Sequence, residues 1–163
     1  MEMSDYLEKL LPFFERYYTI KKDSSNPNYA AYADFNSHNE QYFLVKSAKI
    51  ADIDSNEFVY FSLIQELNIS NFSVIDNQTW QNGLSRVKPY YGHRNSDVTL
   101  IIISNHIDND CKKQIKKTKH YKSYKFSLLG WSNYKLVAVE ISSKSVFTNK
   151  SGKDLKKLVS NIF

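Results

Sequence analysis

Two stretches of the sequence gather side chains that could hold a ligand. The first, Pro89 to Arg94, places two tyrosines, a histidine and an arginine around Gly92, at the entry to an apolar segment. An α/β-type sheet can place a pocket at such a position. Alternatively, the tyrosine rings only pack the loop against the protein. The candidate pocket residues are Tyr90, Tyr91, His93 and Arg94.

The second stretch, Lys112 to Phe126, holds seven lysines together with two tyrosines. Lysines neutralise phosphates and aromatic rings stack on bases, which is what sequence-independent binding of single-stranded nucleic acid requires. The stretch has no arginine that would read a base bidentately, and a solvated helix surface explains the same lysines. The candidate nucleic-acid or polyanion residues are Lys112, Lys116, Lys119, Lys122 and Tyr124.

The formal net charge of +5 is distributed unevenly along the chain. The part up to Arg86 holds 7 basic and 12 acidic residues (−5), and the part after it holds 15 and 5 (+10). Such asymmetry favours a surface that meets a polyanion. Lysine-rich, asparagine-rich and isoleucine-rich composition is also typical of proteins from AT-rich genomes, so the lysines alone do not establish such a surface.

Patterns for catalysis or metal binding are weak. Cys111 has His106 and His120 within ten residues, but it lies on the apolar stripe of a predicted helix, where burial would leave it unreactive. We expect a packed structural cysteine. The chain's four histidines lack metal-ligand spacing, and no hydrolase, dinucleotide or phosphate-loop motif occurs. The sequence therefore predicts no metal and no cofactor, and leans against an enzyme.

The element expected at the centre of the sheet is Val98 to Ile103, which reads V-T-L-I-I-I. This run is β-branched, too short for a buried helix and bounded by turn-prone residues, so it predicts a strand covered on both faces. Asp108 then caps a predicted surface helix, about Asn109 to Lys119.

The N-terminal half predicts a helix followed by strands. The helix runs from about Ser4 to Thr19 and should kink at Pro12, which removes a backbone hydrogen bond. An antiparallel meander should follow, and its three strands are Tyr29 to Asn36, Tyr42 to Ile50 and Glu57 to Ile64. A short helix from Asp76 or Asn77 to Val87 comes next, in which Gly83 costs ~1 kcal/mol.

The C-terminal part predicts a hairpin and a helix. Tyr121 to Leu129 and Asn133 to Ser142 alternate as strands, with Gly130 to Ser132 as their turn. After an extended piece, Val146 to Asn149, a capping box formed by Ser151 and Asp154 should start a helix. The apolar stripe that would dock this helix on the sheet comprises Leu155, Leu158, Val159 and Ile162.

These elements predict one α+β domain over residues 1–163, a mixed, mainly antiparallel sheet flanked by N- and C-terminal helices, in the order α-β-β-β-α-β-α-β-β-α. Its longest apolar run is shorter than the ~20 residues that span a bilayer, so we expect no membrane contact. Met1 to Asp5 lacks the features of a signal peptide, and a lone cysteine forms no internal disulfide. We expect a cytoplasmic protein.

The order helix, three strands, helix, strand resembles the restriction-endonuclease-like core. That family carries a carboxylate on one strand and an E-x-K or D-x-K triplet on the next. Asp34 and Lys46 lie on the corresponding predicted strands, but Leu44 stands where the triplet needs its metal-binding carboxylate. The resemblance implies at most a degenerate nuclease fold.

Three segments carry a second resemblance. They are Tyr42 to Lys46 (Y-F-L-V-K), Phe126 to Val139 (F-S-L-L-G-W-S-N-Y-K-L-V-A-V) and Val146 to Lys153 (V-F-T-N-K-S-G-K). Through them the chain resembles, over nearly its full length, an uncharacterised bacterial family, a domain of unknown function. That resemblance implies no activity. The absence of a catalytic pattern favours a non-enzymatic binding domain for a protein or small ligand, and the alternative is single-stranded nucleic acid or another polyanion.

Overall fold

The computed structural model describes residues 1–23, 25–36 and 54–163. The predicted strand from Tyr42 to Ile50, which contains Leu44 and Lys46, lies outside the described residues, as does the first of the three segments that carry the family resemblance.

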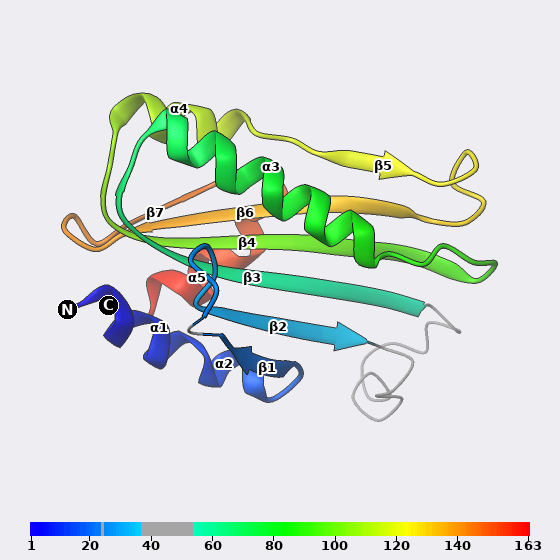
Figure 1. Ribbon diagram of the computed structural model, residues 1–163, viewed down its shortest axis with the longest axis horizontal. Helices are drawn as coiled ribbons and strands as arrows, with labels where there is room; N and C mark the ends of the chain where they lie inside the picture. The colour runs from blue at the N-terminus through cyan, green and yellow to red at the C-terminus, as the bar shows by residue number, and fades with distance from the viewer. Residues whose placement is uncertain (24, 37–53) are drawn as a thin grey trace.

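Seven strands form one mixed sheet in the order β1-β2-β3-β4-β6-β5, with β7 also pairing with β6 (Figure 1). β3, β4 and β6 run parallel to one another, and every other pairing is antiparallel. The predicted α+β class with a mixed, mainly antiparallel sheet is therefore confirmed. The strands are β1 Thr19–Lys22, β2 Ala31–Asn36, β3 Asp54–Leu67, β4 His93–Ile107, β5 Tyr121–Ser123, β6 Trp131–Glu140 and β7 Ser145–Thr148.

β4 is the centre of this sheet, as the V-T-L-I-I-I run predicts. Every residue from 98 to 103 is fully buried, between β3 on one side and β6 on the other. The strand extends beyond the predicted run at both ends because polar residues there also pair with β3, Asn95 opposite Ser55 and His106 opposite Glu66. Backbone pairing, and not side-chain polarity, sets the length of this strand.

Helices cover both faces of the sheet (Figure 1). One face carries α1 (Met3–Leu10), α2 (Pro12–Glu15) and α5 (Lys153–Ser160), and the other carries α3 (Ile69–Arg86) and α4 (Asn109–Lys117). Each face of the sheet has its own hydrophobic core, and alternate residues of β4 pack into one or the other. Ile101 and Ile103 face the terminal helices, and Leu100 and Ile102 face α3 and α4. The N- and C-terminal helices thus flank the sheet, as predicted, from the same side.

The predicted kink at Pro12 is confirmed, because α1 ends at Leu10 and α2 begins with Pro12 at its first position. Proline fits there because its missing N–H would be unpaired anyway. The predicted end of the helix at Thr19 is wrong, since Thr19 to Lys22 form β1 and pair with Ala31 to Asp34. The predicted helix therefore ends early, because this segment forms the edge strand of the sheet.

α3 begins at Ile69, well before the predicted start at Asp76 or Asn77. Its cap is a reciprocal pair, in which Asn71 N donates to Asn68 Oδ1 (3.0 Å) and Asn68 N donates to Asn71 Oδ1 (2.9 Å). The asparagine at the third helical position takes the place of the usual Glu or Gln, which is why the sequence pattern missed it.

Two details of the C-terminal half are corrected. β5 ends at Ser123 and β6 begins at Trp131, so the turn occupies residues 124–130 and not Gly130 to Ser132. The helix α5 is not capped by Ser151, whose hydroxyl lies 3.4 Å from Asn133 Oδ1. Instead, Gly152 N donates to Asn149 Oδ1 at 2.8 Å immediately before the helix.

Candidate functional site

Two loops meet at the end of the sheet where β4 and β6 begin. Residues 87–92, the α3–β4 loop, lead into β4, and residues 124–130, the β5–β6 loop, lead into β6. Because β4 and β6 are parallel neighbours with Asn95 opposite Trp131, their entry loops lie at the same end of the sheet (Figure 1). The structure thus brings the first stretch that the sequence singled out beside the end of the second, residues 124–126.

His93 joins the two loops. Its buried ring lies with Nδ1 2.9 Å from Leu129 O and Nε2 2.9 Å from Ser96 Oγ. Since a carbonyl oxygen only accepts, Nδ1 carries the proton, and the serine hydroxyl donates to Nε2 when the ring is neutral. The Tyr90 ring lies 5.7 Å from the imidazole and the Tyr124 ring 6.4 Å from it. His93 is therefore part of the packing beneath the loops.

The β5–β6 loop is fixed on this base. Gly130 has φ +84°, and a Cβ there would lie 2.5 Å from Arg94 O, so only glycine permits the close approach. Three consecutive non-glycine residues, Lys125, Phe126 and Ser127, have φ of 45°, 52° and 68°. Such left-handed residues are individually costly and persist where surrounding bonds enforce them. Here Tyr124 N donates a hydrogen bond to Gly130 O, and Leu128 N donates one to Lys125 O.

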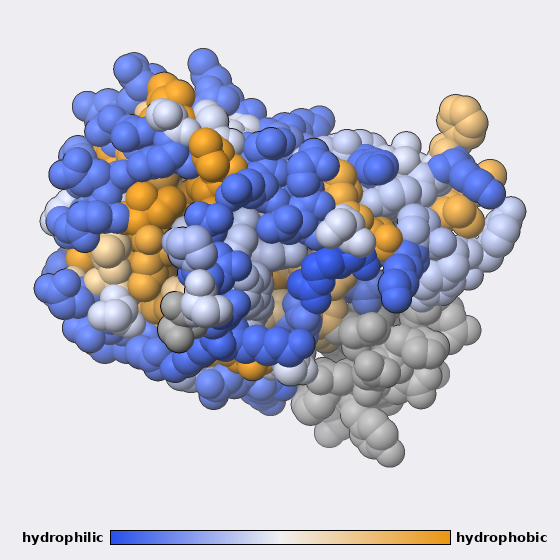
Figure 2. Space-filling model, in the orientation of Figure 1, coloured by the Kyte–Doolittle hydropathy of each residue, from blue (hydrophilic) through white to orange (hydrophobic). Residues whose placement is uncertain are grey.

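The two loops expose large apolar side chains. Phe126 is 99% exposed, Tyr91 79% and Leu128 67%. Figure 2 shows an apolar projection at the corner of the molecule that the β5–β6 loop occupies in Figure 1, with hydrophilic residues around it. Clustered exposed apolar groups on a folded protein commonly mark a contact surface.

The two segments that carry these side chains are cationic. Residues 111–139 contain eight lysines and no aspartate or glutamate, and residues 87–96 contain Lys88 and Arg94 and again no acid. We call this end of the molecule the cationic tip, and its residues are Lys88, Tyr91, Arg94, Lys122, Lys125, Phe126 and Leu128.

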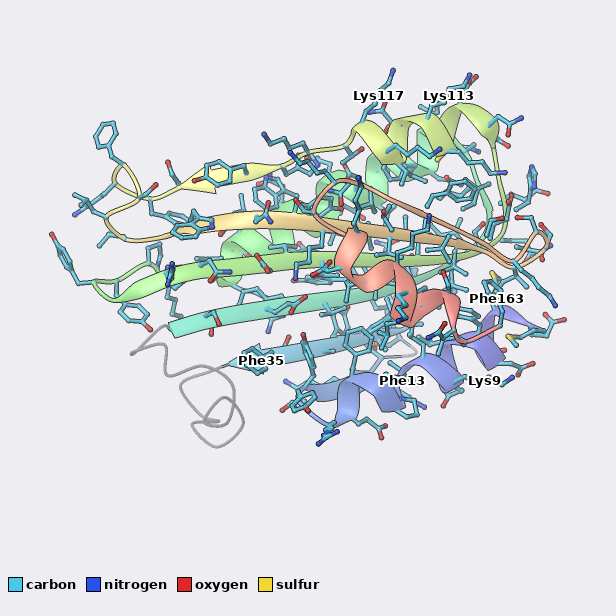
Figure 3. All side chains as sticks on the ribbon, turned by 180° about the vertical axis from the view of Figure 1, so that it is seen from behind. Lys9, Phe13, Phe35, Lys113, Lys117 and Phe163 are labelled. Atoms are coloured by element: carbon cyan, nitrogen blue, oxygen red, sulfur yellow. The ribbon has the colours of Figure 1, made fainter. Side chains whose placement is uncertain are left out.

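The predicted lysines of the second stretch divide into two groups. Lys112 is already paired, since its Nζ lies 3.0 Å from the buried Glu140 carboxylate. Lys116 lies over the Phe147 ring (5.7 Å), and it is exposed, as are Lys119 and Lys122. Lys113 and Lys117, on the same helix, point away from the sheet (Figure 3). α4 and β5 follow one another along the same edge, so this edge continues the cationic tip (Figure 1).

The Tyr124 ring is not free for a base to stack on. Its hydroxyl lies 2.9 Å from Ser132 Oγ, and Lys122 Nζ lies 5.5 Å from the centre of its ring. The ring is thus already in contact with Lys122 and with His93. The most exposed rings of the two loops are Tyr91 and Phe126 instead. Phe126 and Leu128 were missed because their alternation with Tyr124 imitates a strand.

A second polar cluster lies on the sheet face that carries α5. Lys135 Nζ is 3.2 Å from Asp97 Oδ2, 3.2 Å from Asp154 Oδ2 and 3.8 Å from Glu57 Oε1. Burial alone would lower the pKa of Lys135, but the three carboxylates outweigh it and raise that pKa. Glu57 also accepts from Tyr18 Oη (2.6 Å). The cluster links β3, β4, β6 and α5, and no local sequence pattern indicated it.

Cys111 is buried on α4 and has no disulfide. Burial raises the pKa of its thiol to about 11, and the Asp108 carboxylate adds to the shift. The two neighbouring histidines are held by carboxylates, His106 by Glu140 (3.2 Å) and His120 by Asp76 (2.8 Å). The prediction of a packed structural cysteine is confirmed.

Asp34, the carboxylate expected of a nuclease-like strand, is paired with a cation. Arg86 Nη2 donates to Asp34 Oδ2 at 2.6 Å, and its guanidinium lies 4.2 Å from the Phe58 ring centre. In the part of the chain that the structure describes, no group of three or more His, Cys, Asp or Glu side chains is arranged to hold a metal ion.

A groove of about 560 Å³ lies at the opposite end of the sheet, where β3 and β4 end and α3 and α4 begin. Its lining includes Asn68, Ser70, His106 and Asp108. The carboxyl ends of parallel strands are the usual position of ligands in open α/β sheets.

None of the described helices is long and apolar enough to cross a membrane. One family model, described as a domain of unknown function (DUF8052), matches residues 2–161. The resemblance to a domain of unknown function that the sequence suggested is confirmed. No curated protein matches the chain, and no solved structure matches it.

Proposed function

Because the chain belongs to the DUF8052 family, a domain of unknown function, we propose a function from its surface: non-enzymatic binding of a polyanion by the cationic tip and the adjoining edge of α4 and β5. The setting we propose is a bacterial cytoplasm, in which the single cysteine stays reduced.

The observation that supports this proposal most is the separation of charge. The chain as a whole contains 17 acidic residues, but the loops of the cationic tip and the β5 edge lie in two segments that contain none. Lys122 and Lys125 therefore act in a field that no neighbouring carboxylate of their own segment cancels. Such a surface attracts polyanions over distances of about a Debye length.

The binding is expected to be independent of sequence. Lysine is a point charge on a flexible stem, whereas bidentate reading of a base edge requires arginine, asparagine or glutamine. The cationic tip has one arginine, Arg94, beside three lysines. Contacts with phosphates would then supply most of the affinity, and salt would weaken it.

Fluorescence anisotropy with a labelled 20-nucleotide single strand at 50, 100 and 200 mM salt tests the proposal. If about four lysines contact phosphates, log affinity should fall against log salt with a slope near −3, and Lys122→Gln with Lys125→Gln should reduce the slope by about one to two. The matched control is Lys153→Gln with Lys156→Gln, two exposed lysines on α5. No binding at 50 mM salt and ~10 μM protein, or an equal effect of the control pair, would overturn the proposal.

A small-ligand site is the second candidate, because the groove between the starts of α3 and α4 has the volume and the position of such sites. A thermal-shift screen against metabolites tests it. A hit that Ser70→Trp abolishes supports the groove, because the indole would fill it, and a screen without hits counts against it.

A further inference from the structure

We propose that the polyanion is a nucleic acid with unpaired bases, and that Tyr91 and Phe126 are the rings on which those bases stack. This inference rests on the proposed function, since it names the class of polyanion that the cationic tip binds.

The first support is the exposure of the two rings. Phe126 is 99% exposed and Tyr91 79% exposed, and they project from two loops that His93 holds together. A polyanion without bases, such as polyphosphate or a sulfated polysaccharide, would use the lysines and leave both rings in water. A single strand uses both, because it carries a base beside every phosphate.

The second support is the rigidity of the loop that carries Phe126. Gly130 lies against Arg94 and His93, and the loop closes on itself through the bonds from Tyr124 N to Gly130 O and from Leu128 N to Lys125 O. A ring held on a fixed loop loses little freedom when a base stacks on it. The loop therefore presents Phe126 ready for contact.

The third support is the spacing of rings and cations. Lys125 adjoins Phe126 in the loop, and Lys122 and Arg94 flank the same end of the sheet. Phosphates and bases alternate along a single strand, so neighbouring cations and rings can be used together. In a duplex the bases are stacked inside, and only the phosphates would be reached.

Three ligands with about the same number of phosphates separate these contributions: a 20-nucleotide single strand, the same strand with every base removed, and a GC-rich duplex of about 10 base pairs, whose two strands together carry as many phosphates as the single strand. The wild-type protein should bind the single strand about tenfold or more tightly than the abasic strand, because two stacked bases contribute about fivefold or more each. Phe126→Ala and Tyr91→Ala should each lower affinity for the single strand about fivefold to tenfold. Neither should change the salt slope or the affinity for the abasic strand.

Two further variants control for folding and for simple hydrophobic contact. Phe126→Leu keeps an apolar side chain without a π face, so it should weaken single-strand binding nearly as much as Phe126→Ala. Phe13→Ala removes an exposed ring from α2 (Figure 3) and should leave binding unchanged. Circular dichroism of each variant establishes that it is folded.

The outcomes separate this inference from the proposed function. Three results would overturn base stacking and leave polyanion binding in place: equal affinity for the single and abasic strands, tighter binding of the duplex, or unchanged single-strand affinity of Phe126→Leu. Absence of binding to all three ligands at 50 mM salt would overturn polyanion binding itself.

Discussion

Asn149 pairs with Leu136 through both its backbone and its side chain. Asn149 N donates to Leu136 O at 3.1 Å, and Leu136 N donates to Asn149 Oδ1 at 3.0 Å. Leu136 lies on β6 between the residues that pair with β5 and those that pair with β7. A side chain thus completes the outer edge of β6 where neither short strand reaches it.

The same amide makes three further bonds. Its Nδ2 donates to Tyr134 O (2.9 Å) and Thr118 O (3.2 Å), and its Oδ1 accepts from Gly152 N (2.8 Å). Asn149→Leu, which has similar volume, should therefore lower the free energy of unfolding by about 3 kcal/mol or more, since several buried backbone groups lose their partners. Urea denaturation measures this. The exposed Asn77→Leu should change little, and a stable Asn149→Leu would contradict the assignment.

Gly83 gives a second stability prediction. A Cβ at this position of α3 would lie 2.4 Å from Val98 Cγ2 on the central strand. Although alanine favours a helix by about 1 kcal/mol over glycine, Gly83→Ala should destabilise the protein by about 1–3 kcal/mol through overpacking. In a double-mutant cycle, the variant with both Gly83→Ala and Val98→Ala should be at least about 0.5 kcal/mol more stable than the sum of the two single effects predicts. A stabilised Gly83→Ala would show that helix and strand are not in close contact.

The charged cluster predicts loss of stability in alkali. The pKa values of Lys135 and Tyr18 are raised above their ordinary 10.5 and 10.0, Lys135 by its carboxylates and Tyr18 by burial and Glu57. Above about pH 10 the unfolded chain therefore loses these protons first, so the folded state binds more protons and stability falls as pH rises. Urea titrations from pH 7 to 11 should show this fall, and a flat profile above pH 10 would contradict it.

Lys135→Met tests the same cluster at neutral pH. It leaves Asp97, Asp154 and Glu57 without their shared cation, so it should cost roughly 3 kcal/mol at pH 7. Urea denaturation of both proteins at pH 7 measures the cost. An unchanged stability would contradict a shared cation at this position.

Cys111 should be unreactive in the folded protein. Its pKa is raised to about 11 by burial, so very little thiolate exists at pH 8. Labelling with a chromogenic disulfide at pH 8 should be slow without denaturant and complete, at one thiol per chain, in urea. Rapid labelling of the folded protein would contradict this prediction and indicate that Cys111 can act as a nucleophile.

The sequence predicted elements whose cause is local. The β-branched run from 98 to 103 and Pro12 act through their own backbone preferences, and both were found where expected. The resemblance to a domain of unknown function was also correct. By contrast, the strand signal at Phe126 and Leu128 was misleading, because alternation does not show whether a partner strand is present.

Contacts between distant residues could not be predicted. Lys135 meets carboxylates from β3, β4 and α5, and Gly83 meets Val98, only because the sheet order places these elements together. Tyr91 and Lys122 were each singled out from residue type. Their position at one end of the sheet follows from the parallel pairing of β4 with β6, which no local pattern encodes.

An NMR titration of the ¹⁵N-labelled protein with a 20-nucleotide single strand at 50 mM salt locates the binding surface residue by residue. If the strand binds at the cationic tip, shift changes should saturate with added strand and concentrate in residues 87–96 and 121–131, with α5 and residues 68–70 unchanged. Changes centred on the groove residues Asn68 and Asp108, or changes confined to α5, would contradict a binding surface at the cationic tip.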